Sequence, residues 1–284
     1  MKTNDWLVQA TAKLKSVGIG TARLDALVLL EDATGRDRSY LLAYPEVALQ
    51  EDILQRLDEQ VERRMEHEPL AYIRGKTEFY GREFMINKDV LEPRPESETM
   101  IELLKDLYEI APRNKVRSRN SGYIVDVGTG SGALAITAKI ELPHVDVLAT
   151  DIDAKCLKVA RRNAKNHGVV IKFLQGNLLE PLSALSLSPD ALLCNLPYVP
   201  DTYTINQAAA MEPRQAIFGG SDGLDLYRQL FDQIDRYKER IQYVLTESLP
   251  MQHEQLNEIA KKAAYRLQTK DDFIQVFKAT SRLN

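Results

Sequence analysis

The sequence has few cysteines and no long apolar segment. Cys156 and Cys194 are the only cysteines in 284 residues. A single disulfide bond could not stabilise a chain of this length, so we interpret both cysteines as reduced residues of a cytosolic protein. No stretch approaches about 18 consecutive apolar residues, the length that a membrane helix needs. The N-terminal residues MKTNDWLVQATAKLK also lack the apolar core of a secretion signal. We therefore expect a cytoplasmic protein without a membrane segment.

Patterns of metal binding and of nucleophilic hydrolysis are missing as well. The four histidines, His67, His144, His167 and His253, are scattered without the spacing of metal ligands, so we predict no metal site. There is no G-x-S-x-G elbow, and the pattern implies no histidine partner for either cysteine. The net charge of −4 gives no electrostatic reason to expect stable nucleic-acid binding. The composition, 44% hydrophobic and 27% charged, is that of a globular protein.

Helical patterns fill the first quarter of the chain. The segment TARLDALVLLEDATG has Thr21 in place to cap a helix and Gly35 in place to end it. In residues 50–65, apolar residues recur every three to four positions while Glu and Arg occupy the other face; they are Ile53, Leu54, Leu57, Val61 and Met65. These segments predict a small helical domain over residues 1–74.

A hairpin pattern follows the helices. TEFYGREFMI has aromatic and apolar residues on either side of Gly81, which is typical of a β-hairpin. It leads into LEPRPESE, where two prolines set the backbone ahead of a helix that Glu96 or Ser97 could cap. We predict a hairpin linker over residues 75–95 and a larger domain over residues 96–284. Within the latter, the polar and basic APRNKVRSRNSG, residues 111–122, is expected to be a solvated loop.

From Tyr123 onward, strand patterns alternate with helix patterns. Strands are expected within residues 123–128, 145–153, 170–177, 190–198, 241–248 and 271–280, and helices within 133–142, 154–168, 223–238 and 251–264. This alternation predicts an α/β fold with an open, mostly parallel sheet and helices on both faces. In such sheets, ligands bind beyond the carboxyl ends of the strands, where the strand order reverses.

Two polar strand ends predict a cofactor site. VDVGTGSGAL places Gly128, Gly130 and Gly132 between a strand and a helix, and glycines let the backbone turn tightly and approach a ligand. Asp151 ends the next strand, where an acid can accept hydrogen bonds from ribose hydroxyls. Because Gly128, Gly130 and Ala133 also fit the dinucleotide pattern G-x-G-x-x-A, these features leave nicotinamide and adenosyl cofactors open.

A third strand end, CNLPY, distinguishes between them. Asn195 offers a side-chain carbonyl, Leu196 offers a backbone carbonyl, and Pro197 restricts the chain between them and the ring of Tyr198. Two fixed acceptors beside a flat ring suit a planar NH2 group. A nicotinamide dehydrogenase would leave these residues without a role.

These segments carry a resemblance over nearly the whole chain. The segments that carry the resemblance are the glycine turn, NLPYVP, RLDALVLLEDATGRDR, EPLAYIRGKTEFYGREFMI, VLEPRPESE and EPRQAIFGGSDGLDLYRQL. The chain resembles the HemK/PrmC family of protein-(glutamine-N5) methyltransferases, which modify class-1 peptide release factors. The resemblance implies a Rossmann-like, seven-stranded domain that uses S-adenosylmethionine (SAM). It also implies that the N-terminal helices help to hold the protein substrate.

The resemblance assigns roles to individual residues. Gly128, Thr129, Gly130, Ser131 and Gly132 would wrap the methionine part of SAM, Asp151 would bind its ribose, and Asn177 and Leu178 would lie beside its adenine. Asn195, Leu196, Pro197 and Tyr198 stand at the family's N-P-P-Y motif as catalytic residues, and Asn195 would also contact SAM. The role given to Leu196, which replaces a proline, uses a backbone carbonyl that leucine retains. An acid is more usual at Asn177, and TESLPMQHEQL, Thr246–Leu256, departs from the expected Glu-Ile-Gly-like strand end.

The leading hypothesis is a SAM-dependent methyltransferase acting on the Gly-Gly-Gln glutamine of release factors, as a monomer. Alternatives are a ribosomal-protein glutamine, adenine N6 in nucleic acid, and a SAM-binding regulator without turnover.

Overall fold

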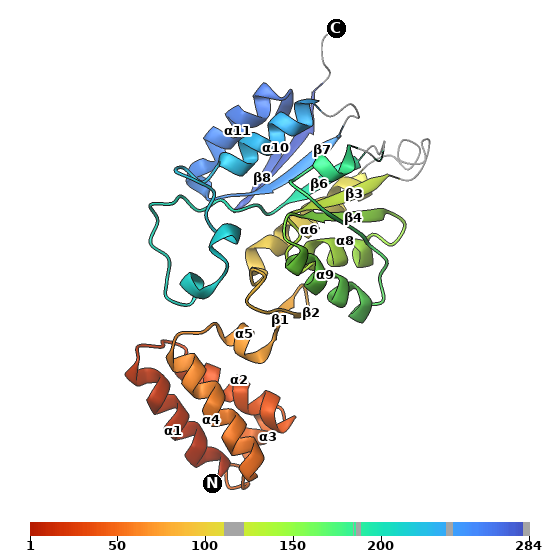
Figure 1. Ribbon diagram of the computed structural model, residues 1–284. Helices are drawn as coiled ribbons and strands as arrows, with labels where there is room; N and C mark the ends of the chain where they lie inside the picture. Colours follow the sequence, from red (N-terminus) through yellow and green to blue (C-terminus); the bar gives the residue numbers. More distant parts are fainter. Residues whose placement is uncertain (111–121, 184, 186–188, 237–240, 281–284) are drawn as a thin grey trace. The chain divides into compact units, whose positions relative to one another are not determined.

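The computed structural model describes residues 1–110, 122–183, 185, 189–236 and 241–280 (Figure 1). These residues form two compact units. The first contains Met1–Lys76 together with Ile205–Met211, and the second contains the rest of the described residues. The predicted solvated loop lies outside the described residues except for Gly122. The division into three domains at residues 74 and 95 stays a prediction.

The first unit is built from helices, as the sequence predicted. They are α1 (Thr3–Ser16), α2 (Ala22–Thr34), α3 (Arg38–Ala43), α4 (Glu51–Met65) and α5 (Leu70–Arg74). Leu57 and Val61 of α4 are buried in its core, and Gly35 ends α2 in the left-handed conformation. Thr21 occupies the predicted N-cap position of α2, but its side chain makes no capping hydrogen bond.

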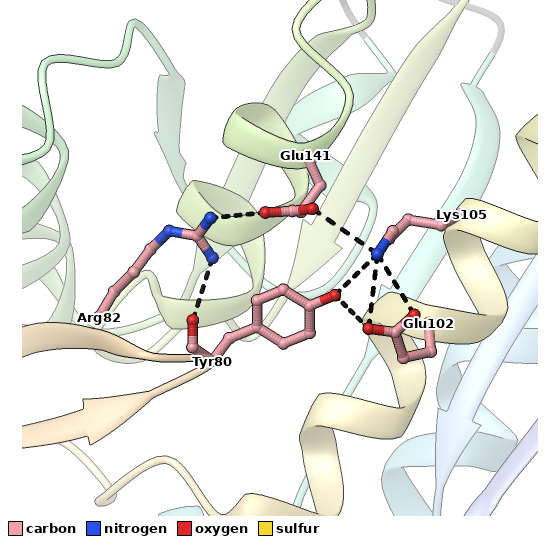
Figure 2. Close-up of polar contacts among 5 residues, drawn as sticks. All are labelled: Tyr80, Arg82, Glu102, Lys105 and Glu141. Atoms are coloured by element: carbon pink, nitrogen blue, oxygen red, sulfur yellow. Dashed lines mark hydrogen bonds and ion pairs between the residues drawn. The ribbon is translucent and has the colours of Figure 1, made fainter.

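The predicted hairpin is confirmed as β1 (Lys76–Phe79) and β2 (Arg82–Met85). Tyr80 and Gly81 at its turn have φ values of 53° and 66°, and two consecutive positive φ angles match the right-handed twist of a hairpin. The phenol of Tyr80 contacts Glu102 and accepts a hydrogen bond from Lys105 at 2.9 Å (Figure 2).

Charged contacts attach the hairpin to two helices of the second unit. Arg82 forms an ion pair of 2.5 Å with Glu141, and Glu141 lies 3.7 Å from Lys105 (Figure 2). On another side, the Asn163 amide donates to Met85 O and accepts from Met85 N, both at 2.9 Å. These bonds fix the hairpin beside the helices that flank the glycine turn.

The second unit contains a seven-stranded sheet in the order β5-β4-β3-β6-β7-β9-β8. The first five strands in this order pair in parallel, and β9 pairs antiparallel with both β7 and β8. The strands are β3 (Tyr123–Val127), β4 (Asp146–Asp151), β5 (Lys172–Gln175), β6 (Pro189–Cys194), β7 (Tyr243–Glu247), β8 (Tyr265–Asp271) and β9 (Ile274–Ala279). The predicted mostly parallel α/β sheet is therefore confirmed.

Helices cover both faces of this sheet (Figure 1). One face carries α6 (Glu98–Ile110), α8 (Ala133–Glu141) and α9 (Ala154–Asn166), and the other carries α10 (Asp225–Arg236) and α11 (His253–Lys262). Alternate strand residues serve the two cores: Ile124 packs with the first group, and Val125 packs with the second. Single 3-10 turns complete the fold; they are η1 (Pro95–Ser97), η2 (Glu180–Leu182), η3 (Ala209–Met211), η4 (Arg214–Ala216) and η5 (Pro250–Gln252).

One strand, β8, has no counterpart among the strands expected from the pattern. It lies at the edge of the sheet, and of its residues only Tyr265 is buried. An exposed edge strand needs few apolar residues, so hydrophobic alternation does not reveal it. In the part of the chain that the structure describes, no helix is long and apolar enough to cross a membrane.

Candidate active site

Four parallel strands bring polar residues to one edge of the sheet. Gly128 follows β3, Asp151 ends β4, Asn195 follows β6 and Glu247 ends β7. The strand order reverses between β3 and β6, which is where such sheets bind ligands. The sequence pattern identified the first three ends. Glu247 was missed because it lies in the segment that departs from the family pattern, although its place at the end of a buried strand was a usable signal.

A cavity of about 310 Å³ opens at this reversal point. Its lining includes these predicted site residues: Gly128, Thr129, Gly130, Ser131, Asp151, Asn177, Leu178, Asn195, Leu196 and Pro197. Two predicted residues, Gly132 and Tyr198, do not line it. The cavity wall also contains residues that sequence reasoning did not assign, among them Asp89, Ser97, Cys156, Gly176 and Gln215.

The glycine turn after β3 is held by its own backbone. The N–H groups of Gly128 and Thr129 both donate to Thr150 O at 2.9 Å, and Gly132 N donates to Thr129 O at 2.8 Å. Below it, the buried Asp126 carboxylate accepts from Thr129 Oγ1 at 2.6 Å and from Ala135 N at 3.1 Å. Burial raises the pKa of Asp126 to about 7, although these two bonds oppose the rise.

The glycines of the turn serve different purposes. At Gly130 a Cβ would meet nothing within 4 Å, so its backbone is open toward the cavity. At Gly132 a Cβ would lie 3.0 Å from Ile136 Cδ1 and 3.1 Å from Ala160 Cβ. Gly132 is therefore required for the packing of α8 against α9, which explains its absence from the cavity wall.

Asp151 lies at the cavity with its carboxylate partly used. Its Oδ2 accepts from Gly130 N at 2.9 Å and its Oδ1 accepts from Asp153 N at 2.9 Å. Burial raises the pKa of Asp151, and these two backbone bonds oppose the rise. A carboxylate has about four acceptor positions, so acceptor capacity remains for a ligand hydroxyl beyond these two bonds and the Cys156 thiol. Asp153 caps α9 by accepting from Lys155 N, as expected for the second acid.

Asn177 and Leu178 form the wall beyond β5. Leu178 has a φ of 53°, and its side chain is buried. Asn177 Nδ2 donates to Glu180 Oε1 at 3.3 Å, which leaves the side-chain carbonyl as its acceptor end. The departure from an acid at this position therefore preserves an acceptor.

A chain of hydrogen bonds joins the asparagine to the phenol three residues later. Asn195 Nδ2 donates to Ser97 Oγ at 2.8 Å, and Ser97 Oγ donates to Glu247 Oε2 at 2.6 Å. Tyr198 Oη donates to Glu247 Oε1 at 3.0 Å. Burial raises the pKa of Glu247, whereas the bonds from Ser97 and Tyr198 lower it. The helix-capping prediction for Glu96 or Ser97 was wrong, because neither makes a capping bond and the Ser97 hydroxyl serves this chain.

The backbone around Leu196 is fixed from below by Tyr227. The fully buried Tyr227 hydroxyl donates toward Cys194 O, 2.9 Å away, and Glu247 O, 2.5 Å away. Burial raises the pKa of Tyr227, and a backbone hydrogen bond with Leu196 opposes the rise. Leucine brings an N–H that proline lacks. The Leu196 side chain is buried under the glycine turn, 3.1 Å from where a Cβ on Gly128 would lie.

These features fit the cofactor that the motifs implied. The glycine turn presents open backbone to the cavity, and the buried Asp151 keeps acceptor capacity for a ribose. Asn195 lines the same cavity, and its NH2 group is bonded to Ser97. The sheet order and these strand ends define the class of protein as a Rossmann-like SAM-dependent methyltransferase.

Comparisons with known proteins narrow this class. A family model described as the PrmC N-terminal domain matches residues 5–75, and one described as the methyltransferase small domain matches residues 112–213. The release factor glutamine methyltransferase of Bacillus subtilis (strain 168) is 40% identical over 211 residues, which cover 73% of this chain and 72% of that protein. The bifunctional methyltransferase of Rickettsia bellii (strain RML369-C) is 31% identical over 284 residues, covering 89% of this chain. The match covers 50% of that longer relative.

The chain belongs to the release factor glutamine methyltransferase family. The predictions of a methyltransferase fold, of an enzyme and of SAM as its cofactor are thereby confirmed. Among solved structures, the hMettl16 catalytic domain in complex with MAT2A 3′UTR hairpin 1 aligns with a TM-score of 0.57 at 14% identity, over 91% of this chain and 92% of that one. At this identity the likeness shows the fold alone.

Proposed function

We propose that this chain transfers a methyl group from SAM to the side-chain amide nitrogen of the glutamine in the Gly-Gly-Gln motif of class-1 release factors. The observation that carries the proposal is the orientation of the Asn195 amide. Its NH2 end donates to Ser97, so its carbonyl end is left to accept from a substrate amide at the cavity. The named activity of the Bacillus subtilis relative supports this substrate.

Different residues around the cavity would bind different parts of the cofactor. The backbone from Gly128 to Ser131 would hold the methionine part, Asp151 would accept from the ribose hydroxyls, and Asn177 and Leu178 would contact the adenine. When bound, SAM supplies a methyl group on a sulfonium, which is already an activated leaving group.

The catalytic work of the chain is positional. An amide nitrogen is a poor nucleophile, because its lone pair is delocalised into the carbonyl. Asn195 Oδ1 and the Leu196 carbonyl would accept the two N–H hydrogens and so direct the lone pair at the methyl carbon. The same two acceptors would stabilise positive charge as it grows on the nitrogen. The N–C bond would form as the S–CH3 bond breaks, which leaves S-adenosylhomocysteine, and the nitrogen would then lose one proton to water to give the neutral methylated amide. Tyr198 does not line the cavity, so it would act on the amide plane only by supporting these acceptors, with its phenol restrained by Glu247.

The proposal is tested with tritiated SAM and purified release factors. We expect label on intact release factor, located on the Gly-Gly-Gln glutamine by mass spectrometry, and none on a release factor whose glutamine is replaced. Equal labelling of both proteins would refute the assigned glutamine. Parallel arms with ribosomal protein and adenine-containing RNA and DNA test the other substrates, and SAM binding without any labelled product would indicate a regulator.

Finer expectations belong to the same proposal. We propose that the protein acts as a monomer in the cytoplasm and does not bind nucleic acid stably. The net charge of −4 supports the last point, since a stable nucleic-acid complex is favoured by excess positive charge.

A further inference from the structure

We propose that Ser97 and Glu247 are positioning residues that decide which end of the Asn195 amide faces the cavity. The inference rests on the proposed function, because methyl transfer to an amide needs the carbonyl of Asn195, and not its NH2 group, to face the substrate. The terminal torsion of an asparagine side chain is broad and roughly two-fold, so the residue cannot make this choice by itself. Its neighbours must make it.

The direction of the hydrogen-bond chain starts at Glu247. An ionised carboxylate accepts hydrogen bonds and donates none. Glu247 is 1% exposed, and its two oxygens face two hydroxyl groups: Ser97 Oγ at 2.6 Å and Tyr198 Oη at 3.0 Å. Both hydroxyls donate to it, and these two bonds lower its pKa against the effect of burial.

This direction passes through Ser97 to Asn195. A serine hydroxyl has one hydrogen, and Ser97 gives it to Glu247, so its oxygen can only accept from another neighbour. The neighbour is the Asn195 amide at 2.8 Å, and only the NH2 end of that amide can donate. The carbonyl end is thereby turned away from Ser97. One carboxylate thus sets the orientation of Asn195 and, through its other oxygen, the place of the Tyr198 phenol.

The fold brings these residues together from distant parts of the chain. Asn195 and Glu247 lie one residue beyond the aligned pair Cys194–Thr246 of the parallel strands β6 and β7. Ser97 comes from η1, the turn that leads into α6. Ser97 is 2% exposed and lines the cavity together with Asn195.

Substitutions of Ser97 or Glu247 can disrupt the hydrogen-bond chain that orients the Asn195 amide while Asn195 itself is kept. Ser97→Ala removes the acceptor of the Asn195 NH2 group, whereas Ser97→Thr keeps a hydroxyl. Glu247→Gln replaces two acceptor oxygens by one acceptor and one donor. A glutamine at this position can accept a hydrogen bond from one of the two hydroxyl groups, but not from both. Thr246→Val is a matched control, because it removes a buried hydroxyl one residue away whose bond, 3.5 Å to Gln275 O, does not involve Asn195.

The first measurement is steady-state methylation of release factor together with SAM binding by calorimetry. We expect Ser97→Ala and Glu247→Gln to lower kcat by about tenfold to a hundredfold, because misplacement of a reacting group by about 1 Å costs up to that much. The SAM dissociation constant and the KM for release factor should stay within about twofold. Ser97→Thr should restore most of kcat, and Thr246→Val should retain it. The double variant should be no slower than the slower single variant, since both changes act through one amide.

The second measurement needs no activity. In protein labelled with 15N-asparagine and lacking substrate, the side-chain NH2 signal of Asn195, assigned with Asn195→Ala, should be protected from hydrogen exchange. Protection should persist in Ser97→Thr and be lost in Ser97→Ala. Unchanged protection or unchanged kcat in Ser97→Ala would overturn the inference, as would a fall in SAM affinity that parallels kcat. If the wild-type protein fails to methylate release factor but shows this protection pattern, the proposed function fails while the positioning geometry stands.

Discussion

Gly132→Ala tests whether helix packing, and not cofactor contact, requires the last glycine of the turn. Gly132 has a φ of 84°, and its Cβ would lie 3.0 Å from Ile136 Cδ1, 3.1 Å from Ala160 Cβ and 3.2 Å from Ala160 Cα. The left-handed conformation costs an alanine about 1–2 kcal/mol. Forcing a methyl group into a packed contact costs about 1–3 kcal/mol more. The lower entropy of the unfolded alanine chain offsets about 0.5 kcal/mol. We therefore expect the second unit to lose about 2–4 kcal/mol.

Two other glycines separate the contributions to this loss. Gly168 has a φ of 66° and nothing within 4 Å of a Cβ, so Gly168→Ala carries the backbone cost alone, about 1 kcal/mol. Gly130 has a φ of 54° and equally open surroundings, but it lines the cavity. Gly130→Ala should resemble Gly168→Ala in stability and, unlike it, should weaken SAM binding.

The assay is urea unfolding followed by far-UV circular dichroism, with SAM affinity measured by calorimetry. The single tryptophan, Trp6, belongs to the first unit, so its fluorescence would report on the wrong part of the chain. If Gly132→Ala lost no more stability than Gly168→Ala, the packing argument would be refuted. If Gly130→Ala bound SAM as tightly as the wild type, the assignment of the turn to the cofactor would be wrong.

Three further predictions concern the other strand ends. Asn195→Ala should lower methyl transfer about 10²–10³-fold while calorimetry finds SAM binding largely intact, because an oriented acceptor acts on the substrate amide; parallel loss of both would contradict this. The pKa of Asp126 is raised to about 7 from an ordinary 3.8, so its contribution to stability is complete below about pH 4 and lost as the pH rises through 7. In urea unfolding, the free energy of unfolding of the wild type should fall by about 4 kcal/mol relative to that of Asp126→Asn between these two pH values. If the difference between the two proteins does not vary with pH, the Asp126 carboxyl is ionised in the folded protein and its pKa is not raised. Leu196→Pro replaces a buried leucine side chain by a smaller ring, so its melting temperature should fall without faster turnover; a much faster variant would show that the lost stiffness limits the rate.

Local sequence signals were sufficient for most elements. Residues 50–65 repeat their apolar residues at helical spacing, and Leu57 and Val61 are buried in α4. Gly81 between two apolar runs predicted the hairpin, whose turn has positive φ at Tyr80 and Gly81. The edge strand β8 was not found by pattern, because an edge exposed to solvent does not require apolar alternation.

The candidate site was predicted in part, for a physical reason. Three predicted residues each follow or end an apolar strand, so the local sequence is enough to predict their chemistry. They are Gly128, Asp151 and Asn195, and the structure brings all three to one cavity. Ser97 was interpreted as a helix cap, and Glu247 was passed over. The place of Glu247 at a strand end marked it as a candidate, but the hydrogen-bond partner of either residue cannot be predicted locally, because it lies 98 or 150 residues away.

The sequence by itself determined the class of fold and the cofactor, and it predicted the reacting groups, since strand ends, glycine turns and acceptor side chains are properties of short segments. The tertiary structure alone decided their orientation. An asparagine offers a donor and an acceptor at nearly the same place, and the order of the residues cannot say which one faces the substrate. That choice follows from the register of β6 against β7, which sets Asn195 beside Glu247, and from the turn that inserts Ser97 between them.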